Sequence, residues 1–323
     1  LLAFLREGNV YSNDQRTVHP EEFPVGIEFR NVSKVYEDGT EAVRNFSLRI
    51  ASHTCMVLLG SSGCGKTTLL RMVNRMVDPS SGQVFIDDDD VADTNPVNLR
   101  RSIGYVMQNA GLLPHRRVVD NVGTVLRLNG AGKAEARERA RELLDMVGLD
   151  QALGDRYPDQ LSGGQQQRVG VARGLAANPN ILLMDEPFGA VDPLVRLDLQ
   201  HELMRLQNDL RKTILFVTHD IDEALTLGDQ IAVLRTGGEI AQMGSPQDII
   251  ENPVDDFVAR FVGVENGRRT LSANPRPAGG WSINDSTGRP PHGQCRDGKI
   301  PRWHIPSIDH GEPPAKAGFD VLF

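Results

Sequence analysis

The chain carries the segment Gly60-Ser61-Ser62-Gly63-Cys64-Gly65-Lys66-Thr67, which fits the pattern G-x-x-x-x-G-K-[ST]. An apolar run, residues 55–59, precedes it, and a helical segment is expected to follow from Thr68 to Met76. Glycines let the backbone curl so that successive N–H groups face one phosphate chain, and a helix N-terminus adds positive charge. We therefore predict a strand, a loop that binds a nucleoside triphosphate, and a helix, in that order.

The residues of this loop, here called the phosphate loop, have separate predicted roles. Lys66 is expected to reach the β- and γ-phosphates, and the hydroxyl of Thr67 is expected to bind Mg²⁺. Cys64 is either a reactive thiol or a small residue that fills its place. The alternative for the whole motif is a chance glycine loop. At average amino-acid frequencies, the probability of a random match in a chain of this length is on the order of 1%.

Three further apolar runs, residues 181–184, 214–217 and 231–234, are typical of buried strands. The first two of these, and the strand before the phosphate loop, end at polar or glycine-rich segments. Ligands bind just beyond the carboxyl ends of strands in open parallel sheets. The sequence therefore predicts an α/β domain with one shared site at these three strand ends.

Carboxylates and a histidine follow two of the predicted strands. Asp185 is suited to hold Mg²⁺ through its water shell, and Glu186 is suited to polarise an attacking water. The alternative for this pair is an exposed acidic turn before Pro187. His219 could hydrogen-bond the γ-phosphate and that water, although a lone histidine is often structural.

The composition excludes several classes of protein. The 323 residues are 39% hydrophobic and 24% charged, which is typical of a globular protein. A net charge of -8 argues against nucleic acid as a partner. No apolar run approaches the ~20 residues that span a bilayer, so a membrane role must come through a partner. Three widely spaced cysteines indicate a reducing cytosol and no metal cluster: Cys55, Cys64 and Cys295.

The chain divides into three zones. Residues 1–24 are predicted to be a loose extension, and residues 25–264 alternate strand and helix patterns. Residues 265–323 are rich in Pro and Gly and are predicted to be disordered, without a packed core. No internal repeat is visible, so we expect one nucleotide-binding unit.

Within the middle zone, residues 133–147 have the pattern of an amphipathic helix. One face carries Ala136, Ala140, Leu143 and Val147. We expect this helix to belong to a helical subdomain of about residues 112–175. The four aspartates of residues 87–90 predict a solvated hairpin turn, because four successive residues cannot all face one metal ion.

A second glycine-containing motif, Leu161-Ser162-Gly163-Gly164-Gln165, resembles the signature motif of ABC ATPases. Ser162 is a good helix N-cap, and the glycines leave N–H groups open before a helix that runs to about residue 178. The resemblance covers residues 26–264. It implies an α/β P-loop NTPase (RecA-like) core with a small antiparallel β subdomain and an inserted α-helical subdomain.

The resemblance implies further roles. In this family the signature motif, here Ser162 to Gln165, closes on the ATP of the other subunit in a head-to-tail dimer. Tyr36 matches the aromatic that stacks on adenine, although strand packing is the alternative. Gln108 matches the glutamine that contacts Mg²⁺ and links the core to the helical subdomain. The dimer seam is matched by Gly189-Ala190-Val191-Asp192.

A finer resemblance concerns the transported solute. Five segments resemble in sequence the ATPases of glycine betaine and other quaternary-amine importers: residues 62–68, 112–115, 161–168, 184–189 and 219–224. This implies ATP and Mg²⁺ as cofactors, and import of an osmoprotectant such as glycine betaine, choline or carnitine. The implied partners are a second copy, an integral membrane permease and, indirectly, an extracytoplasmic solute-binding protein. The implied location is the cytoplasmic face of the inner membrane, as a peripheral subunit.

One departure from that group concerns the tail. Many of its members carry tandem CBS domains after the ATPase core, and residues 265–323 are too few for two such domains. We expect no CBS domain there, and interpret the segment as a degenerate remnant or a frame-shifted reading of a once-longer gene.

Other functions stay open at this point. The chain could serve another small-solute importer, such as an amino-acid-type system. Chromosome-type ABC ATPases need coiled-coil heptads and translation-type ones carry two ATPase units, whereas this chain has neither feature. An exporter half would bring its own membrane helices. An inactive regulator conflicts with the intact set Lys66, Asp185, Glu186 and His219.

Overall fold

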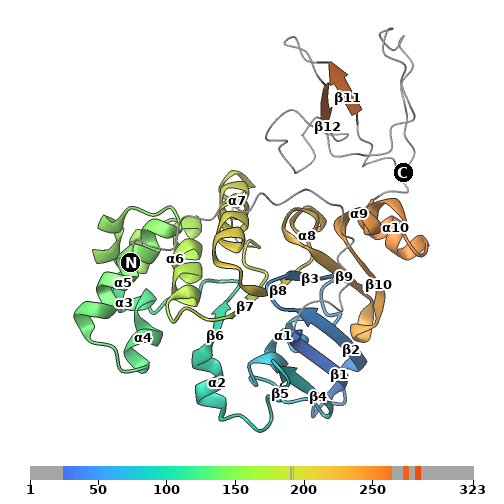
Figure 1. Cartoon of the computed structure of the whole chain (residues 1–323), viewed down its shortest axis with the longest axis horizontal. Coiled ribbons are helices and arrows are strands. Elements are labelled where there is room, and N and C mark those ends of the chain that lie inside the picture. The colour runs from blue at the N-terminus through green and yellow to red at the C-terminus, as the bar shows by residue number, and fades with distance from the viewer. Residues whose placement is uncertain (1–24, 190, 192, 264–271, 276–280, 285–323) are drawn as a thin grey trace, which may run out of the picture.

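The largest sheet has six strands in the order β10-β9-β3-β8-β7-β6 (Figure 1). The computed structural model describes residues 25–189, 191, 193–263, 272–275 and 281–284. Strands β9, β3, β8, β7 and β6 run parallel to one another, and β10 pairs antiparallel with β9. Their bounds are β3 Cys55–Gly60, β6 Ile103–Val106, β7 Ile181–Asp185, β8 Thr213–Thr218, β9 Gln230–Leu234 and β10 Ile240–Gly244. The four predicted strands are β3, β7, β8 and β9, so the prediction of a parallel α/β sheet is confirmed.

A smaller sheet is antiparallel, with the order β2-β1-β4-β5. Its strands are β1 Val25–Val35, β2 Glu41–Ala51, β4 Ser81–Ile86 and β5 Asp89–Asp90. Along β2 the buried residues Phe46, Leu48 and Ile50 alternate with exposed ones, as expected when one face of a strand covers a core. This sheet is the small β subdomain that the resemblance implied.

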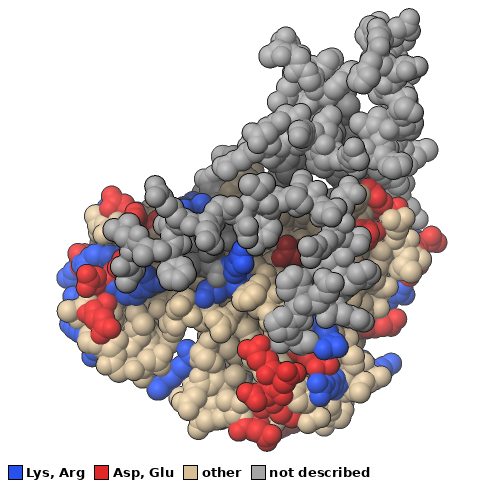
Figure 2. Space-filling view, viewed as in Figure 1, with Lys and Arg blue, Asp and Glu red and all other residues tan. Residues whose placement is uncertain are grey.

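The acidic run forms the turn between β4 and β5. Asp87 and Asp88 have left-handed backbone angles, φ 47° and 72°, which two-residue hairpin turns require and Asp tolerates. Both side chains are exposed, and acidic side chains gather over this lower region in Figure 2. The predicted hairpin turn is therefore confirmed.

The six-stranded sheet separates two hydrophobic cores. Because side chains alternate along a strand, Val57 and Leu59 of β3 face one core while Met56 and Leu58 face the other. The first core packs against the long helices, and the second packs against the small sheet and α1 (Lys66–Val73). Both faces of β3 are thus covered, which explains its uninterrupted apolar sequence.

Helices surround the sheet, and those between β6 and β7 gather on one side of it (Figure 1). Ala136, Ala140, Leu143 and Val147 are all buried, which confirms the predicted amphipathic helix. The helices are α2 Pro96–Ser102, α3 Val118–Val122, α4 Thr124–Leu128, α5 Lys133–Met146, α6 Gly163–Leu175, α7 Pro193–Leu210, α8 Ile221–Leu227, α9 Pro246–Glu251 and α10 Asp256–Val262. Short 3₁₀ turns are η2 Gln151–Asp155, η3 Pro158–Gln160 and η4 Thr236–Gly238.

Two predicted helix boundaries are wrong by a few residues. The helix after the phosphate loop begins at Lys66 and ends at Val73, because Arg75 adopts a left-handed conformation that a helix cannot continue through. The helix after Ser162 ends at Leu175, and Asn178, with φ 51°, lies in the turn that follows. The first change places Lys66 and Thr67 in the first turn of α1, and the second moves no residue of the predicted site.

Most of the terminal zones lie outside the described residues, including residues 1–24, 285–323 and Cys295. Of residues 265–323, the structure describes β11 Ser272–Pro275 and β12 Trp281–Asn284, which pair antiparallel and were not predicted. Within the described part of the chain, no helix combines the length and the apolar character needed to cross a bilayer.

Truncation of a core side chain tests this architecture. Leu58 has 0% exposure, so Leu58→Ala is expected to lower the free energy of unfolding by about 2–5 kcal/mol through lost burial and a cavity. Leu128 is 54% exposed, so Leu128→Ala is the control, with an expected change within about 0.5 kcal/mol. Urea unfolding measures both. Equal losses in the two variants would contradict this placement of Leu58.

Candidate functional site

Three segments that the sequence separates meet at one edge of the six-stranded sheet. Strands β7, β8 and β3 are neighbours and parallel, so their carboxyl ends lie together (Figure 1). The phosphate loop follows β3, Glu186 follows Asp185 at the end of β7, and His219 follows β8. The predicted shared site therefore forms.

The phosphate loop wraps around the start of α1. Gly63 and Gly65 adopt left-handed angles, φ 79° and 105°, and a Cβ at Gly65 would lie 2.5 Å from the carbonyl oxygen of Ala42. Only glycine fits there without moving the backbone. A Cβ at Gly63 would meet nothing within 4 Å, so this side of the loop is open to a ligand. The first N–H groups of α1 have no partner within the helix and point to the same place.

Lys66 lies over the loop, with its ammonium group 2.6 Å from the carbonyl oxygen of Gly60 and 2.8 Å from that of Ser61. A phosphate oxygen could replace these carbonyls as acceptor, since the ammonium group has three donors. Cys64 is 1% exposed and packs in the second core, where a Cβ on Gly60 would touch its sulfur. Its burial supports the small, space-filling interpretation over the reactive thiol.

Thr67 and Asp185 form the pair of oxygen groups that a magnesium ion would need. The hydroxyl of Thr67 donates to Oδ1 of Asp185 at 2.8 Å, and the hydroxyl of Tyr105 donates to Oδ2 at 3.3 Å. Hydroxyl and carboxylate oxygens are ligands that Mg²⁺ prefers, so these residues fit the ion. Burial raises the pKa of Tyr105, which keeps its hydroxyl proton available to Asp185.

Glu186 is the centre of a second cluster. Its Oε2 atom lies 3.1 Å from Nδ1 of His219 and accepts a hydrogen bond of 3.4 Å from the amide of Gln108. Its backbone has φ 46°, an uncommon angle for this residue type, and its N–H donates to the carbonyl oxygen of Val217. The structure thus brings Glu186, His219 and Gln108 together, and Gln108 lies against Glu186 rather than against Thr67 or Asp185.

Tyr36 lies beside the first turn of α1. Its hydroxyl is 3.2 Å from the hydroxyl of Thr68, and the residue is 39% exposed. An exposed flat ring next to a phosphate-binding loop is placed where a base could stack on it. The role in adenine binding stays a prediction.

The signature motif caps α6 away from these contacts. Ser162 accepts a hydrogen bond from the N–H of Gln165, and the Gln165 side chain accepts one from the N–H of Ser162, a capping box. Ser162 and Gly163 are exposed. In the described part of the chain, the motif makes no hydrogen bond to the phosphate loop. Of residues 189–192, Ala190 and Asp192 lie outside the described residues.

Two residues that the sequence analysis missed connect α6 to the segment around Gln108. Gln167, which is buried, donates to the carbonyl oxygen of Met107 at 3.2 Å. Arg173 donates to the carbonyl oxygens of Gly111 and Ala110, at 2.7 and 2.5 Å. Nothing in the pattern distinguished Gln167 from its two neighbouring glutamines, because only the fold decides which of the three faces inward.

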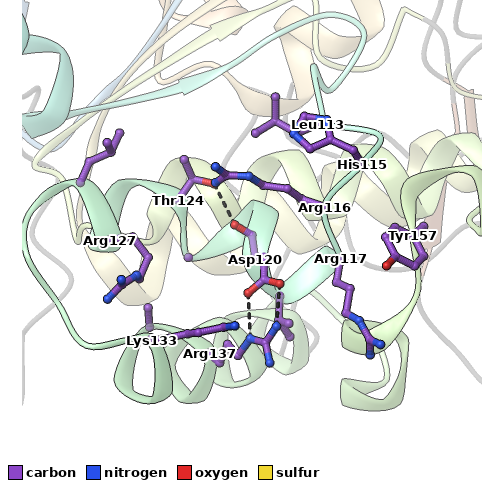
Figure 3. A pocket seen from close by; sticks show the side chains of 14 residues that line it. Leu113, His115, Arg116, Arg117, Asp120, Thr124, Arg127, Lys133, Arg137 and Tyr157 are labelled. Atoms are coloured by element: carbon purple, nitrogen blue, oxygen red, sulfur yellow. Dashed lines mark hydrogen bonds and ion pairs between the residues drawn. The ribbon is translucent and has the colours of Figure 1, made fainter.

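A cavity of about 550 Å³ lies in the helical region, and no residue of the phosphate loop lines it (Figure 3). Cationic side chains from the residues just before α3 and from α4 and α5 line it. They outnumber the single lining carboxylate, Asp120, which pairs with Arg137 at 2.7 Å. We call this cavity the basic pocket. Its cationic residues are Arg116, Arg117, Arg127, Lys133 and Arg137, with His115 at the edge.

The chain resembles known proteins in sequence and in fold. The family model described as ABC transporter matches residues 43–189. The glycine betaine uptake system ATP-binding protein YehX of Escherichia coli is 46% identical over 247 residues, which cover 76% of this chain and 80% of YehX. The chain belongs to the ABC transporter family.

Two other comparisons agree with this family assignment. The choline transport ATP-binding protein OpuBA of Bacillus subtilis is 51% identical, over 77% of this chain and 65% of OpuBA. The chain thus spans slightly less than two thirds of that relative's length. Among ABC transporter cassettes of known structure, dimeric MJ0796 matches with a TM-score of 0.63 and 36% identity, over 68% of this chain and 98% of MJ0796. The fold is therefore that of a P-loop NTPase, as the sequence predicted.

Proposed function

We propose that this member of the ABC transporter family is the ATP-hydrolysing subunit of an osmoprotectant importer. The observation that carries the proposal is the convergence of Lys66, the Thr67–Asp185 pair and the Glu186–His219 pair at one sheet edge. These are the groups needed to hold a triphosphate, a magnesium ion and an attacking water. MJ0796, a similar cassette, has been solved bound to ADP and Pi, which supports nucleotide hydrolysis.

Each residue has a part in the proposed mechanism. Lys66 and the phosphate-loop N–H groups hold the β- and γ-phosphates, while Tyr36 supports the base. Bound Mg²⁺ would neutralise phosphate charge at Thr67 and Asp185. Glu186 orients the water and draws its proton, and His219 and Gln108 hold the carboxylate in place.

The proposed assembly is a head-to-tail dimer on a membrane permease. Ser162 and the N-terminus of α6 are exposed and, among the described residues, make no hydrogen bond to the phosphate loop, which supports contact with the nucleotide of a second copy. MJ0796 has been solved as a dimer. A solute-binding protein would act only through the permease, with this subunit peripheral at the cytoplasmic face of the inner membrane.

The proposed domain organisation follows the sequence zones. Residues 25–264 would form the ATPase unit, with the helical subdomain at about residues 112–175. The buried residues of α3, α5 and α6 continue into the first core of the sheet, so a displacement of these helices would reach the strand ends. Residues 265–323 would lie outside this unit, without CBS domains.

The proposed cargo is a quaternary amine such as glycine betaine, choline or carnitine. The names of OpuBA and YehX include choline and glycine betaine, and the motif sequences of this chain resemble those of quaternary-amine importers. Vesicles with the subunit, its permease, its solute-binding protein and internal ATP test this by uptake of each labelled amine. Uptake of none, with ATP hydrolysis retained, would leave the ATPase assignment and favour a different small-solute importer or a non-transport ABC ATPase. Absence of hydrolysis would favour an inactive regulator.

We also propose that the basic pocket receives an acidic cytoplasmic segment of the permease. Arg116 and Lys133 line it and form no ion pair within the described residues (Figure 3). Leu113, which lines the pocket, lies five residues after Gln108, and the side chain of Asn121 exchanges hydrogen bonds of 2.7 and 3.1 Å with its backbone. A segment bound there would therefore be coupled to the Glu186 cluster.

Charge reversal in the pocket tests this docking surface. The double variant Arg116→Glu, Lys133→Glu is expected to reduce cosedimentation with permease vesicles by about tenfold or more, because like charges would face each other. Arg139→Glu is the control, since Arg139 lies on α5 with Lys133, pairs with Glu142 and does not line the pocket. Cosedimentation of the double variant at the level of this control would rule out the pocket.

A further inference from the structure

One guanidinium group connects the two loops that carry Glu186 and His219. Arg196 lies in the first turn of α7, which packs against α8 (Figure 1). Its NH1 group donates to Oδ2 of Asp220 at 3.0 Å, and its NH2 group donates to the carbonyl oxygen of Val191 at 3.2 Å. Val191 lies five residues after Glu186, and Asp220 directly follows His219.

The residues on both sides of His219, Thr218 and Asp220, are held by hydrogen bonds to α8, and Asp220 is also held by Arg196. Asp220 caps α8 through Oδ1, which accepts from the N–H groups of Asp222 and Glu223, and its other oxygen receives Arg196. Thr218 donates to the carboxylate of Glu223 at 2.6 Å and accepts from the N–H of Asp220. The imidazole of His219 is thereby left to face Glu186.

Glu223 is a buried carboxylate beside Arg196. It is 3% exposed, and its Oε1 atom lies 3.9 Å from NH1 of Arg196. The Nε of Arg196 is buried and has no hydrogen-bond partner in the described part of the chain. A guanidinium that leaves a buried donor unpaired gives up hydrogen-bond energy, so its position is fixed by the acceptors it does reach.

We propose that Arg196 is a positioning residue that sets the distance between His219 and Glu186 by tying the loop after His219 to the segment after Glu186. The proposal rests on the proposed ATPase function. Arg196 touches neither of the two side chains, so it acts through the backbone at Val191, through Asp220 and through its charge beside Glu223.

Kinetics of Arg196→Gln provide the first test. We expect kcat for ATP to fall about tenfold with KM within about twofold, because the nucleotide-binding residues stay in place while the His219 loop loses its anchor. Arg196→Lys, which can reach one acceptor but not both, should recover part of the loss. Arg205→Gln is the matched control on the same helix, since Arg205 contacts Glu202 and the backbone of Met146 instead.

The dependence of kcat for ATP on pH separates this positioning role from a general packing effect. Burial raises the pKa of Glu223 to about 7, while Thr218, Arg196 and His219 oppose the rise and Asp220 adds to it. Removal of Arg196 takes away a cation that favours the ionised carboxylate, so the pKa of Glu223 should rise further. The Glu223-dependent limb of the profile should therefore move to higher pH in Arg196→Gln and vanish in Glu223→Gln.

Hydrogen exchange of the nucleotide-free chain is the deciding arm, since it needs no hydrolysis. Amides of residues 217–223 should exchange about tenfold faster in Arg196→Gln than in the wild type or in Arg205→Gln. Unchanged exchange, or equal changes in kcat and KM, would overturn the role of Arg196. A wild-type chain that hydrolyses no ATP would overturn the proposed function instead, and the exchange result would still decide the contact.

Discussion

Glu186→Gln is expected to lower ATP hydrolysis by about 100-fold or more, while MgATP affinity stays within about twofold. The amide has the size of the carboxylate and can still contact His219 and Gln108, which lie 3.1 and 3.4 Å from Oε2. It cannot draw a proton from water. The variant should therefore accumulate as an ATP-bound dimer, measurable as a shift to twice the mass in size-exclusion chromatography with MgATP.

A matched substitution controls for the loss of one negative charge. Glu142 is exposed, lies on α5 and pairs with Arg139. Because it belongs to neither of the clusters at the strand ends, Glu142→Gln should hydrolyse ATP at the wild-type rate. A Glu186→Gln variant that turns over ATP at the rate of this control would remove Glu186 from its proposed role.

Two inactive variants are expected to restore activity when mixed. Lys66→Ala should lose nucleotide binding, and Ser162→Asp should place a carboxylate against the partner's nucleotide while keeping its helix cap, because Asp caps helices as well as Ser. In a head-to-tail dimer, each mixed pair has one site with both residues intact. An equimolar mixture should therefore recover about a quarter of the wild-type rate, since half the dimers are mixed and each keeps one of two sites.

The control for this mixture is Lys66→Ala with the double variant Lys66→Ala, Ser162→Asp. Those mixed dimers have no intact site, so their rate should stay at the background level. Equal recovery in both mixtures would mean that Ser162 does not act on the nucleotide of a second copy.

Much of the site was predictable because its residues sit at fixed offsets from apolar strands. The runs 55–59, 181–184 and 214–217 predicted parallel strands, and their ends necessarily meet at one sheet edge. Glycine spacing predicted the phosphate loop, where Gly65 fits only because Ala42 of β2 leaves no room for a Cβ. These are local rules, and local rules can be read from one sequence.

Contacts between distant elements could not be predicted in the same way. Gln108 was expected at the metal, and the structure places it against Glu186; its reach toward Mg²⁺ stays a prediction. Arg196 lies on a helix whose pattern gave no sign that its guanidinium bridges Val191 and Asp220. Such bridges depend on how α7 packs against α8, and single-sequence periodicity does not encode that packing.

ATP bound at Lys66 is proposed to power solute import. The most direct test is uptake of labelled glycine betaine into vesicles that contain this subunit, its permease and its solute-binding protein, with MgATP inside. Wild-type vesicles are expected to accumulate the label only with ATP, and vesicles with Lys66→Ala are expected to show no uptake above the ATP-free level. Equal accumulation by wild-type and Lys66→Ala vesicles would contradict the account.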